Sequence, residues 1–226
     1  MKIVNTLRAL ISGHLKGHFG QYAEDVLIRK HFKPRRDKGV CLDIGSYHPF
    51  RFNNTAYLWM CGWKCVNVDA NPNSIELFKK YRSSDINIHA AVISDADLQA
   101  GKTSIDLHFP VRNQRSISAI GTVLKEKIDE ETIAVKVPTQ SIRTILETNN
   151  LENLSYINID IEGLDEAVLF DIDFRKHTPK VITIEQFAKD INEIVDGDVA
   201  RYLRASGYVM HSRAAYTSVY VLDQHC

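Results

Sequence analysis

The stretch VCLDIGSYHPF, residues 40–50, decides the fold class. It begins as a short apolar run and passes through Asp43 to Gly45, where a strand would give way to a loop. Ligands of open α/β sheets bind beyond the carboxyl ends of the strands, and a glycine there admits a close approach of the backbone. SYHP follows Gly45 in place of a full GxGxxG pattern, which weakens the interpretation as a pyrophosphate site.

Apolar runs of similar length recur along the chain with helical stretches between them, the pattern of parallel strands joined by crossovers. Strands are expected at residues 39–44, 64–69, 86–93, 154–160 and 180–185. Helices are expected at residues 53–61, 72–81, 141–147, 163–170 and 193–205. Two last runs, 207–212 and 216–222, are too close for a crossover and predict a hairpin. The sequence therefore predicts a Rossmann-like α/β fold: a mostly parallel sheet with an antiparallel last strand and helices on both faces.

The chain of 226 residues is long enough for one domain with a substantial core, so we expect a single domain over residues 1–226. Residues 1–20 are expected to form an N-terminal extension. Residues 94–138 are less regular, with strands expected at 104–109 and 132–137 around a polar segment. We interpret this segment as an insertion over the sheet that contributes to the acceptor side of the site.

Composition excludes several classes of protein. Lys plus Arg and Asp plus Glu both total 28, so no net positive charge is available to hold a nucleic acid. The four cysteines form neither a CxxC pair nor a zinc pattern, which fits reduced thiols and a cytoplasmic location. Residues 1–18 are too polar and too short for a transmembrane segment or a signal peptide, although a peripheral amphipathic helix stays open.

Carboxylates follow three of the expected strands. Asp69 ends the second strand, where an acidic side chain can accept hydrogen bonds from both hydroxyls of a ribose. Asp160 and Glu162 follow the fourth strand in YINIDIEGLDEAVL, and Glu185 ends the fifth strand in VITIEQF. Charges beside such apolar runs are costly unless they are solvated, paired or acting on a ligand. Helix capping or ion pairing is the alternative explanation for Asp160 and Glu162.

Six segments taken together resemble the FkbM family of methyltransferases over about residues 20–187. They are GQYAEDVLI, LDIGSYHPFRFNNT, VNVDANP, SISAIG, YINIDIEGLDEAVL and VITIEQF, in that order. The resemblance implies transfer of a methyl group from S-adenosylmethionine to an oxygen, often a hydroxyl of a sugar or of a polyketide-type natural product. Many members have DIGANxG where this chain has DIGSYHP, so the contacts of this loop to the cofactor are in doubt.

The resemblance and the strand ends together give the candidate residues. The catalytic candidates are Asp160, Glu162 and Glu185. The cofactor-binding candidates are Asp43, Gly45, Ser46, Asp69, Ala70, Asn71, Ala91 and Asp160. A base could also be His48 or His108, and the arginines Arg112 and Arg115 could hold an anionic acceptor such as a nucleotide sugar. A divalent metal is not predicted, although the three catalytic candidates could hold one.

Two other functions stay open at this point. One is a nicotinamide-dependent oxidoreductase or epimerase, which the missing GxGxxG and the terminal hairpin disfavour. The other is a cofactor-binding or partner-binding module without catalysis. The expected partner is a small-molecule or glycan acceptor and not a nucleic acid, and the chain could also form an oligomer. Nothing in the sequence identifies the acceptor.

Overall fold

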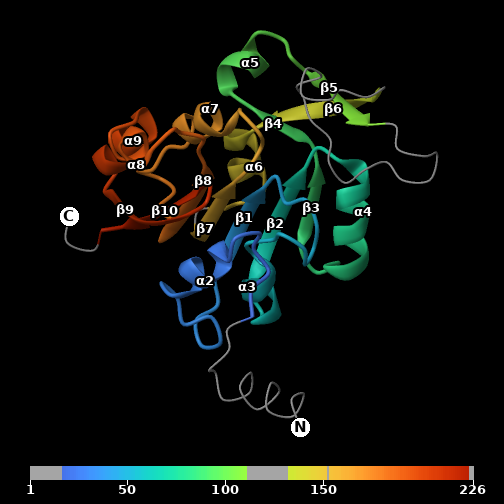
Figure 1. Cartoon of the computed structure of the whole chain (residues 1–226). Helices are drawn as coiled ribbons and strands as arrows, with labels where there is room; N and C mark the ends of the chain where they lie inside the picture. Colours follow the sequence, from blue (N-terminus) through green and yellow to red (C-terminus); the bar gives the residue numbers. More distant parts are fainter. Residues whose placement is uncertain (1–16, 111–131, 152, 224–226) are drawn as a thin grey trace.

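The computed structural model describes residues 17–110, 132–151 and 153–223. Within them, a seven-stranded sheet has the order β3-β2-β1-β7-β8-β10-β9 (Figure 1). Its first five members run parallel: β1 (Val40–Ile44), β2 (Lys64–Asp69), β3 (Ile86–His89), β7 (Leu154–Ile159) and β8 (Val181–Glu185). The prediction of a mostly parallel Rossmann-like sheet is confirmed.

The terminal hairpin is also confirmed. Strands β9 (Tyr208–Ala214) and β10 (Thr217–Leu222) pair antiparallel, and β10 inserts between β9 and β8. Thr217 pairs with Glu185 at the end of β8. This register carries the hairpin turn to the carboxyl end of the parallel strands.

Alternation along the strands divides the core between the two faces of the sheet. Leu42 and Ile44 face a cluster that includes Val168 of α7 (Asp165–Phe170) and Leu203 of α9 (Asp198–Ala205). Cys41, which precedes Leu42 in β1, faces the opposite cluster with Ile28 of α2 (Glu24–Arg29) and Leu58 of α3 (Ala56–Met60). Successive side chains of a strand point to opposite faces, so helices cover both faces, as predicted.

Two of the expected helices begin at side-chain caps. The Asn71 side chain accepts a hydrogen bond from the Asn73 backbone N–H at the start of α4 (Pro72–Tyr81). The Ser141 side chain does the same for the Thr144 N–H before α6 (Ile142–Thr148). Such caps satisfy backbone donors that the first helical turn leaves unpaired.

The expected strand at residues 86–93 is in fact two strands in different sheets. The Ala90 N–H donates to the Asp69 carbonyl at 3.1 Å, where β2 ends, and β3 then has no partner along which to continue. The chain turns into β4 (Ala91–Ile93), which pairs with β6 (Thr132–Ser141). With β5 (Ser104–Pro110), these strands form a second sheet of order β4-β6-β5.

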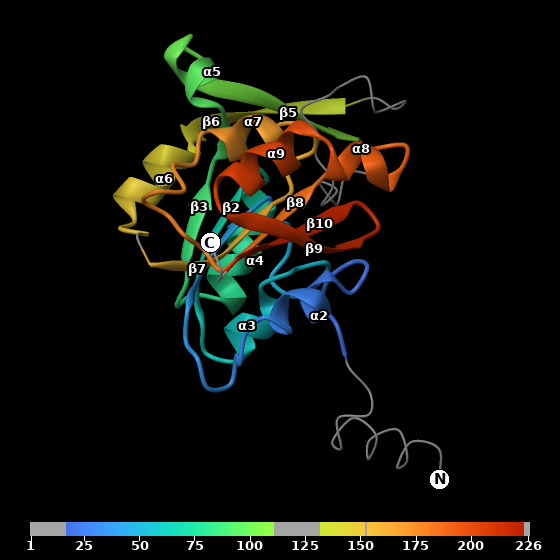
Figure 2. The same cartoon turned by 90° about the vertical axis from the view of Figure 1, so that its left-hand side faces the viewer.

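This second sheet and α5 (Asp95–Gln99) lie beyond one end of the main sheet in both views (Figures 1 and 2). The strands expected within the insertion are therefore present, and they place the insertion at that end. The interpretation that residues 94–138 serve the acceptor side stays a prediction. Residues 1–16 of the expected N-terminal extension lie outside the described residues.

The helix expected at residues 193–205 is broken in two. Helix α8 (Ile191–Val195) ends before Gly197, which caps α9 in an extended conformation. A Cβ on Gly197 would lie 2.7 Å from the Glu193 carbonyl oxygen, so the close approach of the two helices requires glycine. The helical periodicity on both sides of Gly197 concealed the break.

Candidate functional site

A cavity of about 490 Å³ opens at the carboxyl ends of the parallel strands. Its wall includes Gly45 after β1, Asp69 at the end of β2, Asp160 after β7 and Glu185 at the end of β8. The second sheet contributes Ile105 and Leu107 of β5. The insertion therefore closes one side of the cavity with apolar side chains.

Asp69 is the acid that the local backbone holds most firmly. One carboxylate oxygen accepts a hydrogen bond from the Tyr47 N–H and the other from the Asn71 N–H, both at 2.7 Å. Burial raises the pKa of Asp69 to about 6, even though both backbone N–H groups favour the charged form. Each oxygen retains a lone pair for a further donor, so the carboxylate can accept hydrogen bonds from a ligand in the cavity.

An apolar wall adjoins Asp69. It consists of Ile44, Val68, Ala90, Ala91, Val92 and Leu107. Asn71, which also lines the cavity, is buried, and its Nδ2 has no hydrogen-bond partner among the described residues. A buried amide donor left unpaired is costly, so this nitrogen marks a place for a ligand acceptor.

Three carboxylates, Asp160, Glu162 and Glu185, line the other part of the cavity, as predicted from the strand ends. The Asp160 side chain is open to the cavity, while protein surrounds it on its other sides. Burial raises the pKa of Asp160 well above its usual range, and the nearby carboxylates of Glu185 and Asp165 raise it further. Such a group takes up a proton more readily than an ordinary aspartate.

The loop that carries Glu162 is held in an uncommon conformation. Glu162 has a φ of 52° and Gly163 a φ of 105°. Asp165 fixes the loop, because its two carboxylate oxygens accept hydrogen bonds from the Ile161 and Gly163 N–H groups at 2.9 and 2.8 Å. A left-handed residue other than glycine costs free energy, and such residues cluster at functional sites. Tyr47 and Phe52, also on the cavity wall, have positive φ values as well.

Gly45 is required where β1 and β7 lead into the site. Its φ is 79°, and an added Cβ would lie 1.7 Å from the Asp160 carbonyl oxygen. This contact is with backbone, which no side-chain rotation can relieve. The glycine thus allows the loop after β1 to lie directly against the backbone of Asp160, one of the catalytic candidates.

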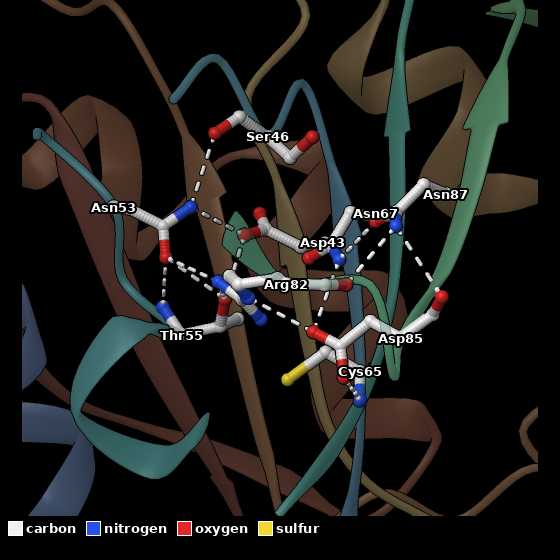
Figure 3. Close-up of polar contacts among 9 residues, drawn as sticks. All are labelled: Asp43, Ser46, Asn53, Thr55, Cys65, Asn67, Arg82, Asp85 and Asn87. Atoms are coloured by element: carbon white, nitrogen blue, oxygen red, sulfur yellow. Dashed lines mark hydrogen bonds and ion pairs between the residues drawn. The ribbon is translucent and has the colours of Figure 1, made fainter. Parts of the chain in front are cut away.

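Two predicted cofactor-binding residues lie outside the cavity lining. Asp43 is buried, and its carboxylate accepts hydrogen bonds from Asn53 and Thr55, both at 3.0 Å (Figure 3). It also accepts one from Asn158 at 2.9 Å. Ser46 is buried as well, and its hydroxyl donates to the Val68 carbonyl at 3.3 Å. These bonds give both residues a role in positioning the loop after β1, and direct contact with a cofactor stays a prediction.

Behind Asp43 lies a fully buried arginine that sequence reasoning missed. Arg82 forms an ion pair with Asp85 at 2.8 Å and donates to Asn53 Oδ1 and Thr55 Oγ1 at 3.3 and 3.1 Å (Figure 3). The Asn53 amide also donates to the Ser46 carbonyl at 3.0 Å. The network therefore links α4 to the loop that borders the cavity. The NNT letters of the resemblance, residues 53–55, are the signal that could have indicated it.

The other candidates for a base lie elsewhere. His48 Nδ1 accepts hydrogen bonds from the Phe50 and Arg51 N–H groups, so this ring is part of a turn. His108 alternates with the cavity-lining Ile105 and Leu107 and is not itself part of the lining. The arginines Arg112 and Arg115 and the SISAIG segment lie outside the described residues.

The remaining predicted cofactor residues, Ala70 and Ala91, line the cavity beside Asp69. The cavity also includes residues that the sequence did not suggest, namely Gln21, Tyr47, Arg51, Phe52, Phe187 and Tyr216. Gln21 lies in the GQYAEDVLI segment of the resemblance, just before α2. Glu24 and Asp25 of that segment are buried residues in the first turn of α2.

In residues 17–110, 132–151 and 153–223, no three histidine, cysteine or carboxylate side chains are grouped so as to hold a metal ion. Cys41, Cys61 and Cys65 are free thiols, and Cys226 is not described. Over the same part of the chain, no helix combines the length and apolar character needed to cross a bilayer.

Comparison with known proteins supports the resemblance. A family model described as the methyltransferase FkbM domain matches residues 43–210, which include Gly45, Asp69, Asp160 and Glu185 of the cavity wall. Searches among curated proteins and among solved structures found no significant match.

Proposed function

Since this chain belongs to the FkbM family of methyltransferases, we propose that it transfers a methyl group from S-adenosylmethionine to a hydroxyl oxygen of a sugar or sugar-bearing metabolite. The observation that carries the proposal is the cavity itself. Asp69 and an apolar wall occupy one part of it, and three carboxylates occupy the other. The first part suits a nucleoside, and the second suits an acceptor that carries hydroxyl groups.

The residues present fit S-adenosylmethionine. Asp69 can accept hydrogen bonds from ribose hydroxyls. Asn71 Nδ2, which has no partner in the described part of the chain, can donate to a ring nitrogen of adenine. The wall of Ile44, Val68 and the residues 90–92 offers apolar contact for a flat base. The absence of a GxGxxG loop agrees with a cofactor that has no pyrophosphate.

S-adenosylmethionine supplies, when bound, an electrophilic methyl group on a sulfonium sulfur. The protein has to align the acceptor oxygen and remove its proton, because a sugar hydroxyl is a poor nucleophile. Asp69 and Asn71 would hold this cofactor, which would supply the methyl group to the acceptor oxygen, and Asp160 would take up the hydroxyl proton that the oxygen loses. Glu162 and Glu185 orient the acceptor through hydrogen bonds from its hydroxyls. The raised pKa of Asp160 suits it to receive this proton.

The cofactor assignment predicts that S-adenosylhomocysteine binds in the micromolar range and that NAD does not. Replacement of Asp69 by Ala should weaken S-adenosylhomocysteine binding by roughly 1–3 kcal/mol, because the ribose hydroxyls lose a charged acceptor. Isothermal titration calorimetry measures both. Asp106→Ala on β5 is the control, since Asp106 is not part of the cavity lining. Equal affinities in wild type and Asp69→Ala would remove Asp69 from the binding site.

The pKa of Asp69 predicts how this binding depends on pH. With a pKa of about 6, the carboxylate is charged at pH 7.5 and mostly protonated at pH 5. Affinity should therefore fall by roughly tenfold between these pH values as the charged acceptor is lost. The Asp69→Asn variant should bind more weakly, with an affinity that hardly changes over this range. A slope that persists in Asp69→Asn would assign the titration to another group.

A further inference from the structure

Three aromatic side chains from distant segments meet beside the cavity. Tyr22 precedes α2, Phe187 follows β8, and Tyr216 lies in the turn between β9 and β10. The ring centroids of Phe187 and Tyr216 are 5.0 Å apart, and those of Tyr22 and Tyr216 are 6.1 Å apart. Phe187 and Tyr216 are part of the cavity wall. We call these three residues the aromatic cluster.

The cluster is exposed, although its rings are large. Relative exposures are 48% for Tyr22, 65% for Phe187 and 47% for Tyr216. Single exposed apolar residues are ordinary, but adjoining ones at a cavity mark a surface that binds a ligand. Aromatic rings lose little conformational freedom on binding and offer a broad apolar face.

The backbone beneath the cluster is held in place. The Gln186 N–H donates to the Tyr216 carbonyl at 2.8 Å, which ties the hairpin turn to the end of β8. The Tyr22 N–H donates to a Glu24 carboxylate oxygen at 2.9 Å. The rings therefore protrude from backbone that is held by hydrogen bonds, which fixes the points from which these side chains extend.

The neighbours of the cluster indicate the chemistry of its ligand. Glu185 is two residues before Phe187 and pairs with Thr217, next to Tyr216. Glu162, Asp160 and Glu185 share the cavity wall with the two rings. Carboxylates accept hydrogen bonds from hydroxyl groups and repel anions, while aromatic faces pack against C–H groups. A neutral ring with C–H groups on its face and hydroxyls at its edge can contact the aromatic rings and donate hydrogen bonds to the carboxylates.

Charge on the cavity wall argues against an anionic ligand at this position. Among the cavity-lining residues that the structure describes, Arg51 is the only lysine or arginine. Its guanidinium lies over the Phe52 ring, 4.6 Å from the centroid, in the loop after β1. The described wall thus carries this one basic side chain against the carboxylates Asp69, Asp160, Glu162 and Glu185.

We propose that Phe187 and Tyr216 form an acceptor subsite on which the pyranose ring of a neutral saccharide stacks, with Glu162 and Glu185 receiving its hydroxyls. This inference rests on the proposed function, because it assigns the acceptor part of the same cavity. It narrows the acceptor to one whose ring at this subsite carries no phosphate or carboxylate.

Saturation-transfer NMR on the full chain with S-adenosylhomocysteine tests the subsite. The probes are the methyl glycosides of glucose, galactose and mannose, with glucose 6-phosphate as the charged counterpart. We expect saturation of the C–H protons on one face of a neutral ring and at least several-fold less with glucose 6-phosphate. Phe187→Ala and Tyr216→Ala should each lower the affinity for the saccharide roughly tenfold, because each variant loses one aromatic face for stacking.

Phe170→Ala and Tyr81→Ala are matched controls, since both side chains are exposed and lie outside the cavity lining. They should leave saccharide contacts unchanged, and calorimetry should show unchanged S-adenosylhomocysteine affinity in all four variants. The subsite is wrong if no neutral saccharide receives saturation, or if the saccharide binds Phe187→Ala and Tyr216→Ala as it binds wild type. A third outcome separates the two proposals. If saccharide binding depends on both rings but the protein does not bind S-adenosylhomocysteine, the subsite is supported and methyl transfer is contradicted.

Discussion

Replacement of Asp160 by Asn is expected to lower the turnover number by about 10²–10⁴-fold, the usual contribution of a general base. The amide keeps the shape of the side chain but cannot take the acceptor proton. Asp160 is one of the three carboxylates that line this part of the cavity, next to the loop after β1, and its pKa is raised by burial and by Glu185. The effect should appear in turnover, with little change in the affinity for S-adenosylhomocysteine.

Glu162→Gln is expected to reduce turnover more than cofactor affinity as well, because Glu162 is assigned to the acceptor and not to the cofactor. Glu166→Gln, on the adjoining helix and outside the cavity lining, is its matched control and should retain wild-type turnover. If activity is abolished by EDTA and restored by Mg²⁺ or Mn²⁺, the acids hold a metal. Full activity of both Asp160→Asn and Glu162→Gln on the true acceptor would leave Glu185 as the cavity-lining candidate for the base.

Much of the sheet was predictable because its signals are local. Each parallel strand is an apolar run of a few residues, and the short spacing between the last two runs requires a hairpin. The division between β3 and β4 was not predictable, since apolar residues continue through Ala90 and Ala91. It depends on where β2 ends and on the register with β6, which are contacts between distant segments.

The candidate site shows the same distinction. Asp69 and Asp160 were indicated by their places at strand ends, and the structure brings both to the cavity wall. Asp43 is the penultimate residue of β1, so its side chain alternates with the cavity-lining Ile44 and faces Asn53 and Asn158 instead. The aromatic cluster could not be predicted, because Tyr22 and Tyr216 are far apart in the sequence and come together only when the sheet has folded.

The buried network behind Asp43 should dominate the stability of this end of the sheet. Replacement of Arg82 by Met is expected to lower the free energy of unfolding by about 3–5 kcal/mol, measured by urea denaturation. The Arg82 and Asp85 side chains are 0% and 2% exposed, so water cannot replace the lost ion pair. Asp43, also buried, would lose the nearby positive charge that favours its ionised form.

An ion pair on α4, the helix that Arg82 follows, provides the control. Lys79 and Glu76 are likewise three residues apart and also lie 2.8 Å from each other, but their side chains are 55% and 69% exposed. Lys79→Met should therefore cost less than about 1 kcal/mol, because water solvates the glutamate that remains. Arg82→Lys keeps the charge but cannot reach Asp85, Asn53 and Thr55 together, so we expect an intermediate loss. If Arg82→Met and Lys79→Met lower the free energy of unfolding by similar amounts, burial of the Arg82 network does not contribute to stability as we expect. A large loss confined to Arg82 would identify α4 as the support of the loop that carries Gly45.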